Sequence, residues 1–338
     1  MEKGYPEWLL SILKEYNIRP RYVEQHGKVY KIFSKDDIYA LKEMNGMRGV
    51  HFFQQLPFLY KRGFHRFVPV YPTKTGNYSV IMNNRVYYLM PWVESALRDD
   101  SEQSKQMMRE LAKLHTLTTK DITVTKEAVE ENLERINQQW KRELTLLEEW
   151  VERCENKVYM SPFEWEFVQY YFEVKKALEY AVRTINLWGE QAKENDKART
   201  TFIHGKIAPN HFLLNEKGYG FFINLENSRY ASPIHDLLPY LSNRLRTHPK
   251  HCNETIELLF TYLKYNPLRK EEMLLLKSYL AYPGDFLQIV RQYDRKKIIN
   301  HELRMTNRLQ KRFWHIKNIE YIIMKLEEIE HAQENAQT

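Results

Sequence analysis

The feature that most constrains the fold is a change of hydrophobic pattern near residue 90. Before it, residues 21–90 contain short β-type runs separated by turns, with one helical stretch near 48–62. After it, apolar residues recur at steps of three and four, and charged helical stretches fill 125–155 and 164–195. The pattern predicts an α+β fold, with a small antiparallel sheet followed by a large helical part.

Two turns identify hairpins within this pattern. Asn83-Asn84 separates two β-type runs, and asparagine tolerates the positive φ angles of a tight turn. A second pair of β runs flanks the turn 215–218 and interrupts the helical part. We therefore expect one hairpin in the sheet-rich part and one hairpin, at 200–226, inside the helical part.

These patterns predict a two-lobed organisation. The N-lobe would carry an N-terminal helix and the antiparallel sheet, and the larger C-lobe would be mainly helical and contain the 200–226 hairpin. A short hinge would join the lobes, and a polar tail would end the chain. The predicted limits are 1–90 for the N-lobe, 91–95 for the hinge, 96–332 for the C-lobe and 333–338 for the tail.

Composition excludes several classes of protein. Aromatic residues make up 14% of the chain, and because each buries a large area, general disorder is excluded. No run of 18 apolar residues occurs, so we expect no membrane span. The N-terminus has charges inside its only apolar stretch, so we expect a protein made in the cytoplasm and not secreted. Cys154 and Cys252 are too few for a disulfide framework.

The positive charge is concentrated in residues 241–318, which hold 16 Lys and Arg against 7 Asp and Glu. Such a segment could meet nucleic acid or an acidic partner. It could equally be a solvated helical face. We favour the solvated face and do not expect a nucleic-acid partner.

Three short elements carry the residues that point to chemistry. The first, at 202–214, reads F-I-H-G-K-I-A-P-N-H-F-L-L; the second, I-N-L-E, occupies 223–226; the third begins at Asp236. Upstream, Lys42 ends a β-type run. A strand lysine that points into a cleft can neutralise nucleotide phosphates, although most strand lysines simply face water.

In order and spacing these elements resemble the signature of the aminoglycoside phosphotransferase and choline kinase group, in the protein-kinase-like superfamily. There the elements read roughly H-G-D-x-x-P-x-N-x-L, I-D-[FW]-[DE] and D-L. Supporting matches are A-L-K at 40–42, L-M-P-W-V-E at 89–94 and L-A-K-L-H at 111–115. Within the superfamily, the hinge sequence and the composition, rich in aromatic and basic residues, look most like the spore coat-associated CotS family of endospore-forming bacteria.

The resemblance covers roughly residues 20–320 and implies several properties. It implies a two-lobed, protein kinase-like fold. It also implies production in the mother cell, association with the spore coat during sporulation, and coat proteins as partners.

Three positions of the family signature depart from it in this chain. The carboxylate that orients the substrate hydroxyl falls on Lys206, which carries the opposite charge. The metal-binding asparagine falls on His211, and the metal-binding aspartate falls on Asn224. Mg²⁺ prefers hard oxygen ligands, so an imidazole is a poor substitute, and an amide lacks the charge that attracts the ion.

Two further features weaken a nucleotide site. Gly27 is the only glycine between Arg21 and Lys42, so the chain lacks a glycine-rich phosphate loop. The helical stretch 48–62 contains no Asp or Glu that could pair with Lys42, and Gln54 or Gln55 is the nearest substitute. We therefore expect the ion pair that positions this lysine to be absent.

These departures together predict a pseudokinase with a structural or scaffolding role, and with no cofactor. The resemblance implies that His204 and Asp236 support the loop even without chemistry, and Glu226 is a weak candidate for a metal ligand.

Two alternatives stay open. In the first, the chain is an atypical small-molecule kinase that uses ATP and Mg²⁺, with Lys42 on the phosphates and Glu226 or Asp236 on the metal. In the second, the interlobe cleft binds a small-molecule ligand without turnover.

Overall fold

The computed structural model describes residues 5–45, 50–94, 100–246, 252–296 and 301–337. Parts of three predicted segments lie outside the described residues, namely the start of the helix at 48–62, residue 95 of the hinge, and residues 247–251 and 297–300 of the basic segment.

The chain divides into two compact units that alternate along the sequence. Unit 1 comprises residues 1–118 and 202–230, and unit 2 comprises 119–201 and 231–338. The predicted lobe limits remain a prediction.

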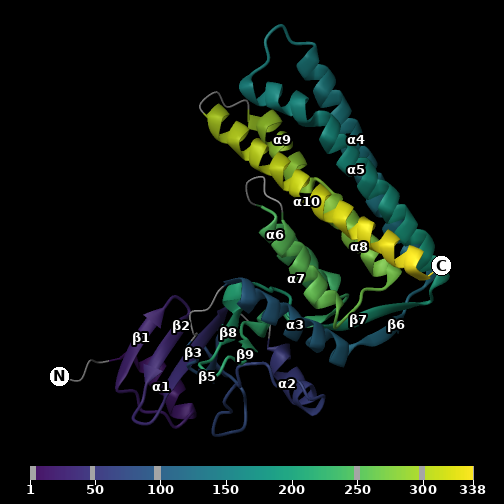
Figure 1. Ribbon diagram of the computed structural model, residues 1–338. Coiled ribbons are helices and arrows are strands. Elements are labelled where there is room, and N and C mark those ends of the chain that lie inside the picture. The colour runs from purple at the N-terminus through teal and green to yellow at the C-terminus, as the bar shows by residue number, and fades with distance from the viewer. Residues whose placement is uncertain (1–4, 46–49, 95–99, 247–251, 297–300, 338) are drawn as a thin grey trace. The chain divides into compact units, whose positions relative to one another are not determined.

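Unit 1 is built on a five-stranded antiparallel sheet in the order β1-β2-β3-β5-β4. Figure 1 labels the first four strands of this order. Its strands are β1 (Tyr22–His26), β2 (Val29–Phe33), β3 (Ile38–Asn45), β4 (Val80–Met82) and β5 (Arg85–Pro91). Its helices are α1 (Glu7–Glu15), α2 (His51–Lys61) and α3 (Asp100–Thr118). The mainly antiparallel sheet with one inserted helix, predicted for 21–90, is confirmed.

Alternation along β3 and β5 sorts their side chains onto two faces. Leu41, Tyr87 and Leu89 lie on the face that α1 covers, in a core cluster with Leu9 and Ile12 and further residues of α1 and β2. Lys42 and Tyr88, which lie opposite each other in the β3–β5 register, therefore point to the other face. On that face the rings of Phe52 and Phe53 meet Tyr88 edge-on, with ring centroids 5.7 and 5.4 Å away.

The predicted tight turn between β4 and β5 is confirmed. Met82 pairs with Arg85, and the two residues between them, Asn83 and Asn84, have φ angles of 51° and 58°. Residues 66–73, in contrast, form isolated bridges and no regular strand, at Phe67 and Tyr71. Prolines at 69 and 72 explain why no regular strand forms here, since proline has no backbone N–H to donate to a ladder.

The second predicted hairpin, within 200–226, is also confirmed. It consists of β8 (Phe212–Leu214) and β9 (Gly220–Phe222) and belongs to unit 1. Short 3₁₀ turns, η1 (Pro209–His211) and η2 (Leu225–Asn227), precede β8 and follow β9. The Gln103 side chain of α3 donates to the carbonyl oxygen of Phe212 at 2.6 Å and so fixes the hairpin to this helix.

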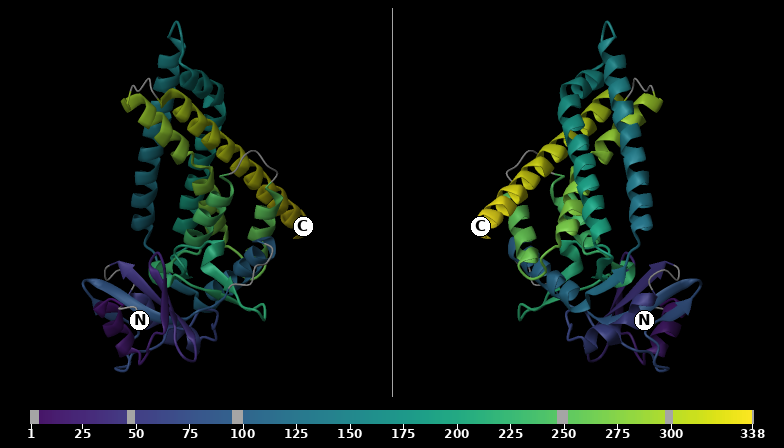
Figure 2. Two further views of the ribbon diagram at one scale, coloured as in Figure 1. Left: turned by 90° about the vertical axis from the view of Figure 1, so that its left-hand side faces the viewer. Right: turned by 90° about the vertical axis from the view of Figure 1, so that its right-hand side faces the viewer.

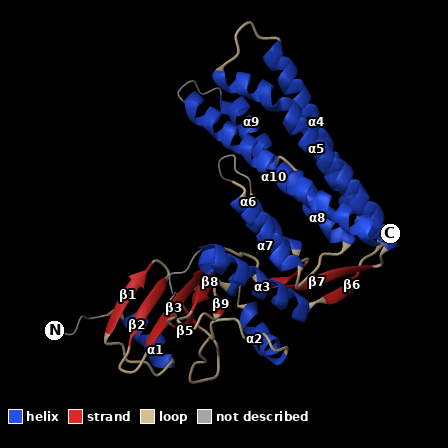
Figure 3. Ribbon diagram, viewed as in Figure 1, coloured by secondary structure: helices blue, strands red, loops and turns tan. Residues whose placement is uncertain are grey.

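Unit 2 is mainly helical (Figure 3). Its helices are α4 (Lys126–Glu155), α5 (Pro162–Glu194), α6 (Ile234–Arg244), α7 (Asn253–Leu263), α8 (Lys270–Ala281), α9 (Gly284–Lys296) and α10 (Glu302–Gln337). Strand β6 (Lys120–Thr123) pairs with the first residues of β7 (Lys197–Ile203), and β10 (Arg229–Ala231) lies at the boundary between the units. Helix α10 continues through residues 333–337, beyond the predicted end of the helical pattern at 332.

Helices α4 and α5 form a long antiparallel hairpin, seen side by side in both views of Figure 2. Local signals start each helix, because the Thr125 side chain caps α4, and Ser161 and Glu164 form a capping box at α5. Aromatic packing then holds α4 to its neighbours. Trp140 stacks on Tyr282 with ring centroids 4.7 Å apart.

Several basic residues of the 241–318 segment take part in ion pairs within unit 2. Arg246 and Arg312 approach Asp285 at 2.8 and 3.4 Å, and Lys317 contacts Glu173 at 3.0 Å. These pairs indicate that part of the positive charge stabilises packing of the helices. Within the described residues, no helix combines the length and apolarity that crossing a membrane requires.

The buried His315 of α10 makes stability sensitive to acid. Its Nε2–H donates to the Ser242 carbonyl at 3.0 Å, and burial, reinforced by Arg246 and Arg312, lowers its pKa to about 4. The unfolded ring binds its proton near pH 6.5 and the folded ring only near pH 4, so acid favours unfolding between these values. We expect the free energy of unfolding to fall by up to about 3 kcal/mol across this window from this group.

Urea unfolding at pH 8, 6 and 5 measures this effect. His315→Gln keeps a donor for the Ser242 carbonyl and should flatten the pH dependence, whereas His235→Gln, at an exposed position, should retain it. An unchanged pH dependence in His315→Gln would contradict the assignment.

Candidate functional site

The candidate residues of unit 1 come from two parts of the chain. Lys42 lies on the face of β3 and β5 that α1 does not cover, and the other candidates lie in the 204–227 segment. A close approach of backbone makes this arrangement possible at Gly205, which has a φ angle of 79°. A Cβ atom on Gly205 would come within 2.1 Å of the Asn227 carbonyl oxygen. Only glycine therefore fits where the 204–206 turn meets the 223–227 segment.

The Lys42 ammonium is at the centre of the site. Its Nζ atom donates hydrogen bonds to Oδ1 of Asn224 and Oε1 of Glu226. The Tyr88 hydroxyl donates to the same Glu226 oxygen at 2.6 Å, and the Tyr88 ring centroid lies 5.8 Å from Nζ. The side chains of Lys42 and Glu226 are only 14% and 17% exposed, so this is a buried, hydrogen-bonded ion pair.

Opposing effects set the charges of this pair. Burial alone would raise the pKa of Glu226, but the Lys42 charge and the hydrogen bonds from Lys42 and Tyr88 hold that pKa below its usual value. Burial lowers the pKa of Lys42, and Glu226 offsets only part of that effect. Burial, followed by the Glu226 charge, raises the pKa of Tyr88 well above 10, so Tyr88 stays a neutral donor.

Asn224 reaches Lys42 from an unusual backbone conformation. Its φ and ψ angles are 65° and 46°, the left-handed region, and it begins the η2 turn. Asparagine is among the few residues that adopt this conformation at low cost. The turn places Asn224 and Glu226 on the same side, so that both side-chain oxygens reach one ammonium.

His204 links the 204–206 turn to the segment that begins at Ile223. The ring is fully buried; Nε2–H donates to the Ile223 carbonyl at 2.8 Å, and Nδ1 accepts the Lys206 backbone N–H at 3.3 Å. A carbonyl can only accept and an amide can only donate, so these partners define the tautomer with the proton on Nε2.

His211 has the opposite tautomer. Its Nδ1–H donates to the Lys206 carbonyl at 2.7 Å, which leaves the Nε2 lone pair as the ring's acceptor. The ring stacks on His204 with centroids 5.8 Å apart. Burial lowers the pKa of His211, and the charges of Lys206 and Lys42 add to this effect, so the ring is neutral at pH 7.

The side chain of Lys206 is exposed, whereas its backbone N–H and carbonyl organise both histidines. The carboxylate that lies against Lys42 is that of Glu226. Asp236, the other residue predicted to support the loop, belongs to unit 2, where it is 1% exposed in the first turn of α6.

The expectation that Lys42 lacks an ion-pair partner is wrong. Helix α2 offers no carboxylate, as its sequence shows, but Glu226 provides one from a segment remote in the chain. Sequence reasoning also missed Tyr88, although strand alternation could have placed it on the same face as Lys42. Among the described residues, no three His, Cys, Asp or Glu side chains converge as a metal site would require.

Comparison with known proteins gives a family and a fold. A family model described as "Spore coat putative kinase YutH" matches residues 10–326. No curated protein matches the sequence.

Solved structures support the fold. An aminoglycoside phosphotransferase from Alicyclobacillus acidocaldarius has a TM-score of 0.70 at 14% identity, covering 96% of this chain and 98% of that chain. The AMP-bound spectinomycin phosphotransferase APH(9)-Ia has a TM-score of 0.53 at 13% identity, covering 94% and 98%. The α+β, protein kinase-like fold predicted from the sequence is therefore confirmed.

Replacing Glu226 should destabilise unit 1, because Glu226→Gln leaves the Lys42 ammonium buried without its counter-charge. We expect a loss of about 3 kcal/mol in the free energy of unfolding at pH 7. The pKa of Glu226 is lowered, so its contribution is present above the unfolded pKa of 4.5 and is lost as the pH falls below it. The difference between the variant and the wild type should therefore shrink in acid.

Glu148→Gln provides the control, since the exposed Glu148 pairs with Lys175 at 2.7 Å. It should cost less than about 1 kcal/mol. Equal costs for the two variants, measured by urea unfolding, would show that the Lys42–Glu226 pair has no special weight.

Proposed function

The chain belongs to the YutH family of spore coat kinase-like proteins, and from this premise we propose that it is a pseudokinase with a structural or scaffolding role in sporulation. In this proposal the protein is made in the mother-cell cytoplasm, is not secreted, and associates with coat proteins.

The observation that carries the pseudokinase proposal is the engagement of Lys42. In kinase-like phosphotransferases the strand lysine contacts nucleotide phosphates. Here its ammonium is hydrogen-bonded to Asn224 and Glu226 and lies beside Tyr88. Two of the three N–H donors of this ammonium are therefore occupied, and a phosphate that displaced Glu226 would break a buried ion pair, which typically costs several kcal/mol.

The ligand set around the loop supports the same proposal. The amide oxygen of Asn224 accepts from Lys42, and His211 offers an imidazole nitrogen where Mg²⁺ would require an oxygen. Lys206, at the position of the carboxylate in the family signature, has no acceptor side chain. These residues therefore do not fit Mg²⁺-ATP in the way the superfamily holds it.

The β1–β2 turn also supports the pseudokinase proposal, because it is poorly suited to bind phosphates. His26 pairs with Val29, so only Gly27 and Lys28 connect the two strands. A connection of two residues, with a single glycine, does not provide the run of backbone N–H groups that cradles phosphates.

We assign His204 and Asp236 supporting roles. His204 joins the 204–206 turn to Ile223 through both ring nitrogens, and neither hydrogen bond depends on phosphoryl transfer. Asp236 is a buried acid in the first turn of α6, where the helix dipole stabilises a negative charge.

A second candidate function is an atypical small-molecule kinase, and one observation favours it. Glu226 is ionised beside Asn224, so displacement of Lys42 would expose two oxygen ligands suited to Mg²⁺. A non-catalytic ligand-binding module is the remaining alternative, and it requires only that Lys42 contacts a ligand.

Thermal unfolding with ATP, with and without Mg²⁺, separates these functions. A pseudokinase should show no Mg²⁺-dependent stabilisation, because a ligand raises stability only by binding the folded state. Asn224→Asp, which returns a charged oxygen ligand, is the matched comparison and should respond more to Mg²⁺ than the wild type. Metal-dependent ATP turnover that is abolished in Glu226→Ala would overturn the pseudokinase proposal.

Coat association has an independent test. A fluorescent fusion expressed from the native promoter should form a ring around the forespore in sporulating cells. A fusion that stays diffuse throughout sporulation, while remaining full length, would contradict coat association without affecting the pseudokinase proposal.

A further inference from the structure

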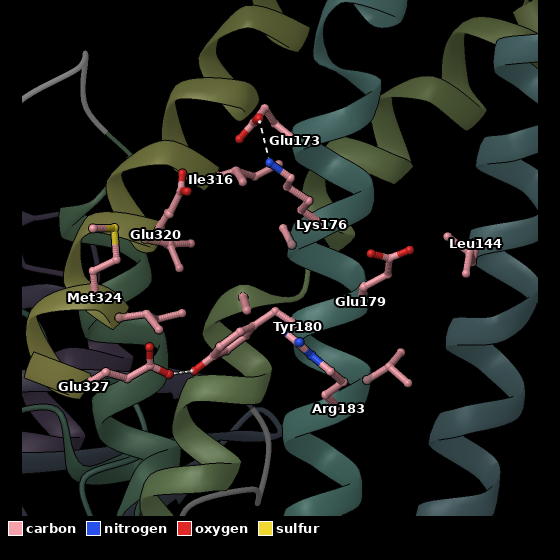
Figure 4. A pocket seen from close by; sticks show the side chains of 15 residues that line it. Leu144, Glu173, Lys176, Glu179, Tyr180, Arg183, Ile316, Glu320, Met324 and Glu327 are labelled. Atoms are coloured by element: carbon pink, nitrogen blue, oxygen red, sulfur yellow. Dashed lines mark hydrogen bonds and ion pairs between the residues drawn. The ribbon is translucent and has the colours of Figure 1, made fainter. Parts of the chain in front are cut away.

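A second site candidate lies in unit 2 and shares no residue with the site in unit 1. A cavity of about 730 Å³ opens between the middle of α5 and the middle of α10 (Figure 4). Leu144 of α4 and Ala281 of α8 complete its lining. This volume is within the range of pockets that bind small organic molecules.

The inner wall of the cavity is apolar. Ile316, Ile319 and Ile323 recur at helical spacing on α10, and each is 6% exposed. Opposite them, Ala177 of α5 and Ala281 of α8 end at Cβ and leave the space open. The wall therefore favours an aliphatic or alicyclic group over a polar one.

The rim of the cavity is acidic. Glu173, Glu179, Glu320 and Glu327 line it, against the cations Lys176 and Arg183. Two of these carboxylates already share a cation, because Lys317 contacts both Glu173 and Glu320. Lys176 lies 3.6 Å from Glu173, and the Arg183 guanidinium lies over the Tyr180 ring, 5.9 Å from its centroid.

Glu327 is the carboxylate best placed to meet a ligand. The Tyr180 hydroxyl donates to its Oε1 atom at 2.6 Å and fixes the group at the edge of the apolar wall (Figure 4). Within the part of the chain that the structure describes, no lysine or arginine pairs with Glu327. Burial, together with Glu327, raises the pKa of Tyr180, so the phenol remains a neutral donor.

We propose that this cavity binds a small amphipathic amine, with its apolar body against the isoleucines of α10 and its ammonium group at Glu327. An ammonium group would donate to the carboxylate oxygen that Tyr180 does not use and would compensate its charge. An anionic ligand of the same shape would meet Glu327 with a like charge. The site does not rest on the pseudokinase proposal, because all its residues belong to unit 2.

Three probes of equal chain length test the chemistry on the full-length protein. Calorimetric titration with n-octylamine should show saturable binding about tenfold tighter than n-octanol, because only the amine gains a charge-assisted hydrogen bond. Octanoate should bind more weakly than octanol. The proposal would be overturned if octanoate bound as tightly as octylamine or more tightly, or if octylamine did not bind.

Two variants locate the binding. Glu327→Gln should remove the preference for octylamine over octanol, while Glu328→Gln should retain it, since Glu328 is exposed and pairs with Lys325 at 2.6 Å. Ala177→Leu should narrow the space opposite the isoleucines and weaken the binding of both probes, with a circular dichroism spectrum like that of the wild type. An amine preference that survives Glu327→Gln would place the binding elsewhere and contradict the assignment.

Discussion

The buried ammonium of Lys42 is the point on which the site in unit 1 depends. An unpaired charge at 14% exposure would be strongly destabilising, so the chain must bring acceptors to it. Asn224 and Glu226 supply these acceptors from a segment about 180 residues further along the sequence. This pairing holds the 223–227 segment against β3, and Tyr88 of β5 completes the contact.

The loop around this pair is organised by its backbone more than by side-chain chemistry. The Lys206 amide and carbonyl each bind one histidine, and the two rings take opposite tautomers as a result. Gly205 allows the close approach to Asn227 that this geometry requires. None of these contacts requires a phosphoryl group.

Some features of the fold follow from local sequence signals, and others depend on packing. The turns at Asn83-Asn84 and 215–218, and the long helices α4 and α5, follow from local signals: positive φ, capping residues and hydrophobic period. In the 66–73 segment, prolines interrupt the β-type residues, and only isolated bridges form. Burial of His315 and the cavity beside α10 could not be predicted, since each depends on which helices pack together.

The sequence by itself determined the α+β fold class and the order of the main helices and hairpins. These properties rest on hydrophobic period and turn chemistry, which are local. Only the tertiary structure decided that Lys42 is paired, that its partner is Glu226 and not a residue of α2, and that the side chain of Lys206 is exposed. The reason is physical: the charge state and partner of a buried ion depend on desolvation and on distances between remote segments, and neither is encoded in a local pattern.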